Sequence, residues 1–404
     1  MKRSSGAPGP QAAPKPLRGI RVLALEQFAS APYGSMFLAD LGAEVIKVEN
    51  PATGGDPARR SGPYALGTTD SEYFQGWNTN KRSVALDLAT EAGRRDFERL
   101  VRTADALLDN LRGDVPGRLG LDHASLAHLN PAIVCLHISA YGRDNERAAR
   151  PGYDYLMQAE AGLMSLTGEP DGPPARYGTS TIDYMTGMTG VVGLLACLLE
   201  ARRTGRGCDV DVSLFDVALH QLNYVATWYL NERHVSSRIE RSAHFSLGPV
   251  QTYPTADGWV YLMCMTQKFW LALLETLARA DLGADERFAT AELRHRNRAA
   301  LTACLDEEFR AHPTAYWLER LSERLPIAPV NDLAGALDSE FVRRTGMVRR
   351  VQHPHKADLR LLANPIRVNG ARLAQAACSL LDADRDKLLE EKSVSGPAPG
   401  GPIP

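Results

Sequence analysis

Two short strand-like runs separated by a helix of small residues constrain the fold of this chain more than any other feature. The runs are "GIRVLAL" (19–25) and "AEVIKVE" (43–49), and the predicted helix runs from about Pro32 to Leu41, with Gly42 ending it. A strand, a helix and a strand within about thirty residues form a βαβ unit. Such a unit has parallel strands joined by a right-handed crossover. The sequence therefore predicts a parallel sheet.

Later segments continue this alternation. Further strands are predicted at 82–88, 104–110 and 132–139, with helices at about 91–103 and 122–129. Strands that alternate with helices indicate the α/β class. We predict a Rossmann-like, doubly wound α/β large domain.

The pattern changes after residue 150. Helices are predicted over 153–168 and 183–205, and "CDVDVSLF" (208–215) alternates as a half-buried strand does. From about residue 245 a hairpin around Asp257–Gly258 is followed by helices, which indicates a smaller α+β domain. The predicted parts are a disordered tail (1–17), the N-terminal part of the large domain (18–225), the small domain (245–332), a C-terminal part that returns to the large domain (333–392) and a flexible tail (393–404).

Composition excludes several classes of partner. Hydrophobic residues make up 44% of the 404 residues and charged residues 23%, as in soluble globular proteins. A net charge of −2 creates no field that attracts nucleic acid. Apolar stretches such as 191–199 are too short to span a bilayer, and the N-terminus lacks the apolar core of a secretory signal. We expect no nucleic-acid partner and no membrane.

Cysteine and histidine are scattered along the chain. The six cysteines form no CxxC pair and have no short spacing to histidine, which argues against structural zinc and against a disulfide framework. "HPH" (353–355) is the closest histidine pair, and a solvated loop explains it better than a metal site. These features predict a cytoplasmic protein without a metal.

Known nucleotide and hydrolase motifs are missing. The turn after the first strand reads "EQFASAPYG" and contains no GxGxxG, so a nicotinamide dinucleotide is not expected. The chain also has no P-loop, no HExxH and no GxSxG motif.

One carboxylate stands out in "YGTSTIDYMTGM" (177–188), where Asp183 precedes a long apolar run. Aspartate is a favoured helix N-cap, so Asp183 is a candidate cap. It is also a candidate nucleophile, since an aspartate of pKa near 3.9 is ionised at neutral pH and needs no adjacent base. N–H groups at the helix N-terminus would then stabilise an anionic intermediate.

The helix that follows carries small residues on one ridge. Gly187, Gly190, Gly193 and Ala196 recur at every third position. Because glycine lowers helix stability, such a ridge predicts that another element packs very close to this helix.

Several segments, in one order, resemble the family III CoA-transferases, whose superfamily includes formyl-CoA transferase, L-carnitine CoA-transferase and α-methylacyl-CoA racemase. The resemblance covers roughly residues 18–392. Its segments are "FASAPYGSMFLADLGAEVIKVE" (28–49), "NTNKRSVALDL" (78–88), "PGYDYLMQAEAGLMSLTG" (151–168), "STIDYMTGMTGVVGLLACLLEARRTGRG" (179–206) and "TADGWVYL" (255–262).

This resemblance implies a function and an assembly. Asp183 occupies the place of the family's nucleophilic aspartate, which accepts the acyl group as a mixed anhydride and then carries CoA as a thioester. The chain is thereby expected to move CoA from an acyl-CoA to a carboxylic acid, with coenzyme A as part of a co-substrate and without a metal. The family fold is an interlocked homodimer.

A racemase is the alternative within the superfamily. Racemases have a histidine followed by an aspartate ahead of the helix that is predicted here to begin near residue 154, and this chain has Tyr153 in the place of the histidine. Tyrosine, with a pKa near 10, is a poor base at neutral pH. The formyl-CoA transferase branch has tyrosine followed by an acidic residue, which Asp154 matches. Tyr153 and Asp154 are therefore candidate catalytic residues, although Tyr153 could instead pack between sheet and helix.

The resemblance also suggests contacts to CoA. The candidates are Ala29, in the turn where the family lets the CoA chain pass, Leu86 beside the adenine, and Asn110 and Arg118 near the nucleotide. A guanidinium suits a phosphate because it forms planar, bidentate hydrogen bonds. Arg118 as a solvated helix-end residue is the alternative.

The sequence departs from the formyl-CoA transferases in one loop. Their glycine-rich loop covers the active site, whereas the equivalent stretch "RSAHFSLGPVQTY" (241–253) holds a single glycine. A different acyl acceptor is therefore expected. Arg59, Arg60 and Arg82 are candidates to pair with the free carboxylate of a dicarboxylic substrate.

Overall fold

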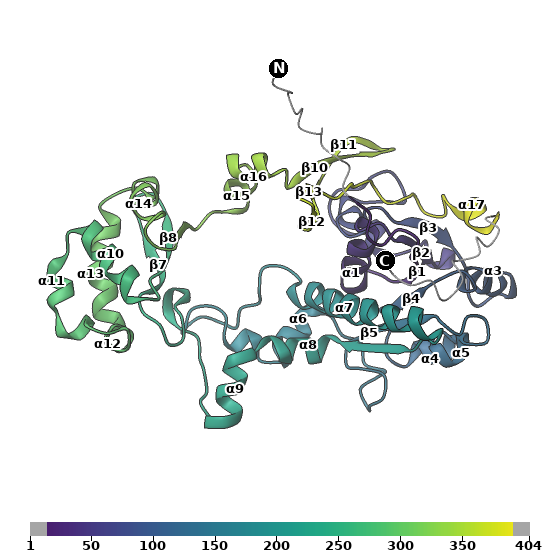
Figure 1. Cartoon of the computed structure of the whole chain (residues 1–404), viewed down its shortest axis with the longest axis horizontal. Helices are drawn as coiled ribbons and strands as arrows, with labels where there is room; N and C mark the ends of the chain where they lie inside the picture. The colour runs from purple at the N-terminus through teal and green to yellow at the C-terminus, as the bar shows by residue number, and fades with distance from the viewer. Residues whose placement is uncertain (1–13, 391–404) are drawn as a thin grey trace, which may run out of the picture. The chain divides into compact units, whose positions relative to one another are not determined.

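A parallel sheet of six strands organises the first part of the molecule, in the order β3-β2-β1-β4-β5-β6. Figure 1 labels β1 to β5 of this sheet. All of its neighbouring strands pair in parallel, so the predicted parallel α/β sheet is confirmed. The strands are β1 (Arg21–Leu25), β2 (Glu44–Glu49), β3 (Arg82–Ala85), β4 (Ala106–Asp109), β5 (Val134–Ser139) and β6 (Asp209–Ser213). The chain order reverses between β1 and β4, and ligands of open α/β sheets bind in the crevice at such a point.

The computed structural model describes residues 14–390, which form two units. The first comprises residues up to 161, residues 178–221 and residues from 340 onward, and the second comprises residues 162–177 and 222–339. The predicted tail 393–404 and most of the predicted tail 1–17 lie outside the described residues. Inside them, the Leu17 N–H donates to the Leu41 carbonyl at 3.1 Å.

Helices cover the sheet of the first unit. They are α1 (Ser30–Asp40), α2 (Glu72–Gln75), α3 (Glu91–Val101), α4 (Val115–Leu119), α5 (His123–Leu126), α6 (Asp154–Glu160), α7 (Thr181–Thr204), α8 (Leu214–Gln221), α16 (Glu340–Thr345) and α17 (Arg385–Glu390). The C-terminal segment adds the antiparallel pairs β10 (Val348–His353) with β11 (Lys356–Leu362) and β12 (Arg367–Val368) with β13 (Ala371–Arg372). It returns to the sheet where the Ser83 N–H donates to Asp384 at 3.0 Å.

Helix α7 packs against α1, β5 and β6 through its ridge of small residues. A Cβ on Gly187 would collide with the Ser30 carbonyl oxygen, and one on Gly190 would lie 3.1 Å from the Leu136 side chain. The predicted close approach to this ridge is confirmed. Of the described helices, α7 alone has the length and apolar composition to cross a membrane, although the apolar run 191–199 by itself is shorter.

The helix predicted over 153–168 is shorter than expected. It ends at Glu160, and Gly162 adopts a left-handed conformation with φ 90° before a 3-10 turn at Leu163–Ser165. The apolar spacing continues through this break, but the backbone does not. The helical prediction was therefore wrong beyond residue 161.

The second unit contains the predicted hairpin. Strands β7 (Val250–Pro254) and β8 (Trp259–Met263) pair antiparallel, and β9 (Ile327–Pro329) adds to β8. Its helices are α9 (Asn223–Glu232), α10 (Gln267–Leu277), α11 (Ala280–Ala284), α12 (Ala291–Arg296), α13 (Arg298–Arg310), α14 (Thr314–Leu321) and α15 (Leu333–Leu337).

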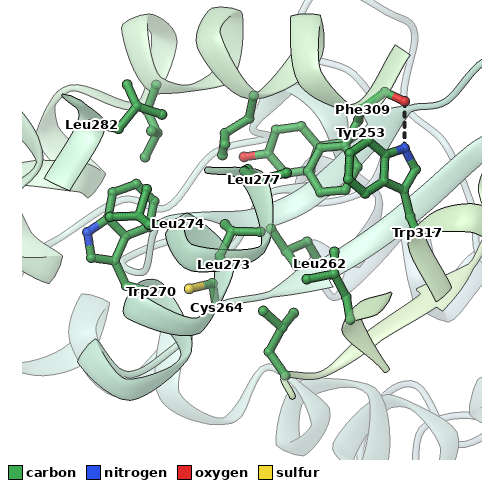
Figure 2. Close-up of a cluster of buried hydrophobic side chains, with 14 of the residues drawn as sticks. Tyr253, Leu262, Cys264, Trp270, Leu273, Leu274, Leu277, Leu282, Phe309 and Trp317 are labelled. Atoms are coloured by element: carbon green, nitrogen blue, oxygen red, sulfur yellow. Dashed lines mark hydrogen bonds between the residues drawn. The ribbon is translucent and has the colours of Figure 1, made fainter. Parts of the chain in front are cut away.

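This unit has its own hydrophobic core. Leucines of α10 and the aromatic rings of Tyr253, Trp270, Phe309 and Trp317 converge there (Figure 2). The Trp317 indole N–H donates to the Phe309 carbonyl at 2.8 Å, so the one polar atom of that ring is satisfied inside the core.

Candidate active site

Two cavities lie at the carboxyl ends of the parallel strands. We call the first the Asp183 cavity. It has a volume of about 270 Å³ and is lined by Gln27, Phe28, Ala29, Ser30, Asn110, Leu111, Arg112, Ile138, Ser139, Ala140, Arg150, Pro151, Gly152, Tyr153, Asp183 and Leu214. The second, the Leu86 cavity, has about 280 Å³ and includes Leu86, Asn50, Asp87 and Leu119. Gln27 and Leu111 line both, so the cavities adjoin along the crevice at the switch point.

Asp183 is half-buried at the third position of α7 and faces its cavity. Its carboxylate accepts no hydrogen bond from residues 14–390. Burial raises the pKa of Asp183 to about 7, and repulsion from Asp154 adds to the shift. The expectation of an ordinary pKa near 3.9 was therefore wrong, because that value holds for a solvated carboxylate. Close to neutral pH, Asp183 is therefore partly ionised, and its carboxylate is more basic than a solvated one.

Asp154, rather than Asp183, caps α7. Its Oδ2 accepts from the N–H groups of Ile182 at 2.6 Å and Asp183 at 3.0 Å, and its Oδ1 accepts from the Gln158 amide at 2.5 Å. The side chain of Ser180, the N-cap residue, contributes no cap. The capping interpretation of Asp183 was thus wrong, since the cap comes from a residue distant in sequence.

This cap uses N–H groups that the sequence had assigned to an anionic intermediate. Besides the two N–H groups bound by Asp154, the N–H of Tyr184 donates to the Ser180 carbonyl at 3.1 Å. The first turn of α7 is therefore engaged within the protein. The expectation that it stabilises charge in the reaction was wrong.

The N-terminus of α1 offers donors instead. Its N-cap is Ala29, and no side chain of the described chain caps this helix. Ala29 and Ser30 both line the Asp183 cavity. Because the first N–H groups of a helix have no intrahelical partner, an uncapped N-terminus attracts negative charge. Ala29, predicted from the sequence as a CoA contact, thus presents backbone to the cavity.

The turn before α1 is held rigidly. Phe28 adopts φ 57°, and its N–H donates to Asp56 Oδ1 at 3.1 Å. The Asn110 side chain accepts from the Gln27 N–H at 2.9 Å and donates to the Gln27 carbonyl at 2.7 Å. A positive φ in a non-glycine residue persists only where the surroundings fix it. Asn110 lies beside the predicted site, and its amide positions this turn.

A buried ion network, made of Glu26, Lys47, Glu49, Asp56, Arg59 and Lys81, supports the same turn. Lys47 Nζ lies 2.9 Å from Asp56 Oδ2, and Lys81 Nζ lies 2.6 Å from Glu26 Oε1. The charged groups of these four side chains are fully buried. Asp56 therefore links the network to the Phe28 turn.

Tyr153 is 63% exposed and lines the Asp183 cavity. Its ring stands edge-on to Phe28 with the centroids 6.4 Å apart. This exposure excludes the alternative in which Tyr153 packs between sheet and helix. Tyr153, Asp183 and Ala29 thus meet in one cavity, although they are far apart in the sequence.

Of the other two predicted CoA contacts, Leu86 and Arg118, only Leu86 lines a cavity. Leu86 is buried and lines the Leu86 cavity. The Arg118 side chain is 66% exposed, lies 3.4 Å from Asp114 and lines neither cavity, whereas its neighbour Leu119 does line the Leu86 cavity.

The three arginines proposed from the sequence as carboxylate partners are already engaged. Arg59 is buried and donates to both oxygens of Glu49 at 2.8 and 2.7 Å. Arg60 donates to the Gly54 and Thr53 carbonyls at 2.7 and 2.6 Å. Arg82 pairs with Glu44 and lies 3.5 Å from Asp384. None lines the Asp183 cavity, so this prediction was wrong.

Arg150 is one of several lining residues that sequence reasoning missed. It is exposed and lies in a polar loop with other arginines. No motif distinguishes it, because its place at the cavity follows from the path of the loop between β5 and α6.

The loop that departs from the formyl-CoA transferases lies in the second unit. Arg241 and Ser242 adopt positive φ values of 60° and 53° there. The Arg241 guanidinium donates to Asp306 at 2.8 and 2.7 Å, and its backbone N–H donates to Glu169 at 2.9 Å. Hydrogen bonds to Asp306 and Glu169 therefore hold this turn in a left-handed backbone conformation that glycine adopts more readily. That this stretch covers the site stays a prediction.

Comparison with known proteins decides the family. The model of CoA-transferase family III matches residues 17–380. The chain belongs to this family. The family III chain is 34% identical to a succinate–glutarate CoA-transferase of Agrobacterium fabrum over 82% of its length and 84% of that protein. It is 32% identical to a succinyl-CoA:mesaconate CoA-transferase of Haloarcula marismortui over 94% of its own length and 96% of that protein.

A solved structure agrees with the fold of this family III chain. A CAIB/BAIF family protein from Brucella suis matches with a TM-score of 0.81 and 33% identity, over 93% of this chain and all of that one. The predicted membership is confirmed, the chain is a CoA-transferase by these relatives, and the racemase alternative is not favoured. Residues 14–390 contain no group of three or more histidine, cysteine or acidic side chains placed to hold a metal.

Proposed function

We propose that Asp183 carries the transfer of CoA as a covalent nucleophile. The observation that supports this role is the half-buried Asp183 carboxylate, which accepts no hydrogen bond from the described residues and lies in a cavity where the N-terminus of α1 begins. A pKa of about 7 makes this carboxylate more basic than a solvated one while leaving it partly ionised at neutral pH. Both properties favour attack on a thioester.

Each step of the proposed reaction transfers one acyl group from a leaving oxygen or sulfur to an attacking one. The Asp183 carboxylate attacks the thioester carbonyl and expels the CoA thiolate, which leaves a mixed anhydride. The thiolate then attacks the aspartyl carbonyl, so the donor acid leaves and an aspartyl-CoA thioester remains. The acceptor carboxylate attacks that thioester to form a second anhydride and free the thiolate. Attack of the thiolate on the acceptor carbonyl gives the new acyl-CoA and restores Asp183.

The chain's own groups divide the work in this scheme. The N–H groups of Ala29 and Ser30 face the oxyanion, since the first turn of α7 is already used by Asp154. Asp154 positions Asp183 and raises its basicity. The Tyr153 hydroxyl, exposed in the same cavity, is placed to donate a hydrogen bond to a reacting oxygen.

The substrates follow from the relatives and the crevice. Both curated relatives are named for small dicarboxylic acids, so we propose succinyl-CoA as the donor and a short dicarboxylate as the acceptor. We place the CoA chain from the Leu86 cavity to the Asp183 cavity, because Gln27 and Leu111 line both. We place Arg118 beside the nucleotide end of that path, because its neighbour Leu119 lines the Leu86 cavity.

Trapping of the acyl-enzyme tests the proposal. Hydroxylamine added with succinyl-CoA should convert Asp183 to a hydroxamate, detected by peptide mass spectrometry. Asp183→Asn should lower kcat roughly 10⁴-fold, as loss of a covalent nucleophile does. Asp386→Asn, at an exposed position of α17, is the matched control and should keep full activity. Transfer at the normal rate with an unmodified Asp183 peptide would exclude the covalent route.

The assembly implied by the resemblance is proposed separately. Two chains would form an interlocked homodimer in the cytoplasm. Sedimentation equilibrium of the full chain should give twice the 44.1 kDa of one chain. A monomer with full transferase activity would contradict this assembly.

A further inference from the structure

Arg150 has an unusual place among the arginines around the site. It lines the Asp183 cavity, yet its guanidinium makes no hydrogen bond or ion pair to residues 14–390. Arg112, which lines the same cavity, lies 3.3 Å from Asp114. Arg147, three residues earlier in the same loop, lies 2.6 Å from Glu160. Arg150 is thus the lining arginine whose charge the described protein leaves unpaired.

The acidic groups around Arg150 do not take up its charge. Arg150 attracts Glu160 electrostatically but forms no hydrogen bond to it. The Glu160 carboxylate already accepts hydrogen bonds from the Tyr141 hydroxyl at 2.7 Å and from Arg147 at 2.6 Å. Asp183 shares the cavity, but its pKa is raised by burial and by Asp154, with no opposing cation. Arg150 therefore does not serve to ionise Asp183.

We propose that Arg150 binds the distal carboxylate of a dicarboxylic acyl group whose other carboxyl reacts at Asp183. This inference rests on the proposed function and deepens it, since it assigns the substrate class to one residue. A guanidinium matches a carboxylate through two parallel hydrogen bonds, which fix orientation as well as add affinity. With one end held by Arg150, the reacting carbonyl stays in the part of the cavity that Asp183 and the α1 N-terminus share.

Paired donors test this role. Succinyl-CoA and butyryl-CoA have acyl chains of the same length, and only the first carries a second carboxylate. Arg150→Gln should lower kcat/KM for succinyl-CoA by about 10- to 100-fold, as expected for loss of a charge-assisted hydrogen bond. The value for butyryl-CoA should stay within about 3-fold. Arg150→Lys should recover part of the succinyl-CoA activity, because it keeps the charge and loses the bidentate geometry.

Arg147→Gln is the matched control, since Arg147 lies in the same loop and pairs with Glu160 outside the cavity lining. It should leave the ratio of the two donors unchanged. An unchanged ratio in Arg150→Gln would overturn the inference, and an equal loss for both donors would assign Arg150 to CoA instead.

The covalent chemistry is read separately in the same samples. Asp183 hydroxamate formed from butyryl-CoA in Arg150→Gln shows that the nucleophile still works, so a failed ratio test would then count against Arg150 alone. Absence of hydroxamate from both donors in the wild type would overturn the proposed function and, with it, this inference.

Discussion

Two regions of the first unit bury charged side chains, and they differ in whether each buried charge is paired with an opposite one. In the buried ion network below the β1–α1 turn, each charge faces an opposite one. At the start of α7, the Asp183 carboxylate is repelled by the Asp154 carboxylate, and no cation of the described residues lowers its pKa. Both regions are built on the carboxyl edge of the same sheet.

The titration of the two regions differs accordingly. Burial alone would raise the pKa of Glu26, but Lys81 and Lys47 outweigh it and hold that pKa below its usual value. For Asp183, burial and Asp154 act in the same direction and raise the pKa to about 7. Compensated charge holds a turn in place, and uncompensated charge is kept reactive. The comparison therefore separates the scaffold of the site from its chemistry.

The largest effect is expected from breaking the network. Lys81→Met removes a cation that lies 2.6 Å from Glu26 and leaves that carboxylate with fewer partners. We expect a loss of about 3–5 kcal/mol in the free energy of unfolding, measured by urea denaturation. Lys356→Met breaks a pair of the same length with Glu72, in which the lysine is 42% exposed, and should cost less than about 1 kcal/mol. Equal losses of unfolding free energy in Lys81→Met and Lys356→Met would show that the buried network stabilises the fold no more than an exposed ion pair does.

His137, a buried histidine that is paired with two aspartates, should make the free energy of unfolding depend on pH. Burial lowers the pKa of His137, but its hydrogen bonds to Asp109 at 2.6 Å and Asp209 at 3.1 Å outweigh burial and raise the pKa to about 9. The stabilisation is full below the unfolded pKa near 6.5 and is lost as the pH rises through 9. We expect the free energy of unfolding to fall by roughly 2–3 kcal/mol between pH 7 and pH 10. His137→Asn should remove most of this slope, and the same slope in the variant would disprove the assignment.

Neutralising the Asp183 carboxylate should increase the free energy of unfolding, whereas breaking the buried ion network should lower it. Because the folded pKa of Asp183 is raised, its ionised form costs stability, and this cost grows from about pH 4 to pH 7 and is constant above pH 7. Asp183→Asn should therefore stabilise the fold by about 1–2 kcal/mol at pH 8, and by less at pH 5, although it lowers kcat as stated above. A destabilised variant at pH 8 would contradict the account of this carboxylate.

Asp154→Asn should have the smallest effect on stability. It keeps one oxygen as an acceptor for the α7 N-terminus, so a loss of about 1 kcal/mol is expected. Because the variant removes a negative charge beside Asp183, the pKa that governs kcat/KM should move to lower pH. Gln158→Ala, which leaves that charge in place, is the control. An unshifted pH profile in Asp154→Asn would show that Asp154 acts on structure alone.

Local patterns predicted much of the fold. The βαβ unit at 19–49 identified the parallel sheet, and Asp257–Gly258 identified the hairpin of the second unit. Turn chemistry and side-chain periodicity act between near neighbours, so they can be read from the sequence. The prediction failed at Gly162, where apolar spacing continues through a backbone break.

The candidate site was predicted only in part. Resemblance selected Asp183 and Tyr153, and the structure places both in one cavity, with their catalytic roles still proposals. The cap on α7, the pKa of Asp183 and the place of Arg150 were not accessible to sequence reasoning. Each depends on groups brought together by the fold, such as Asp154 from α6 against the first turn of α7.

By itself, the sequence determined the α/β class, the family and the identity of the carboxylate proposed to react, because periodicity, turn residues and ordered motifs are properties of the chain. Only the tertiary structure decided which charges are neutralised. The sequence does not distinguish Arg59, Arg60 and Arg82 from other arginines, but the fold gives each of them a hydrogen-bond partner, whereas the Arg150 guanidinium has none within residues 14–390. Charge compensation depends on distance and burial in three dimensions, and sequence separation specifies neither.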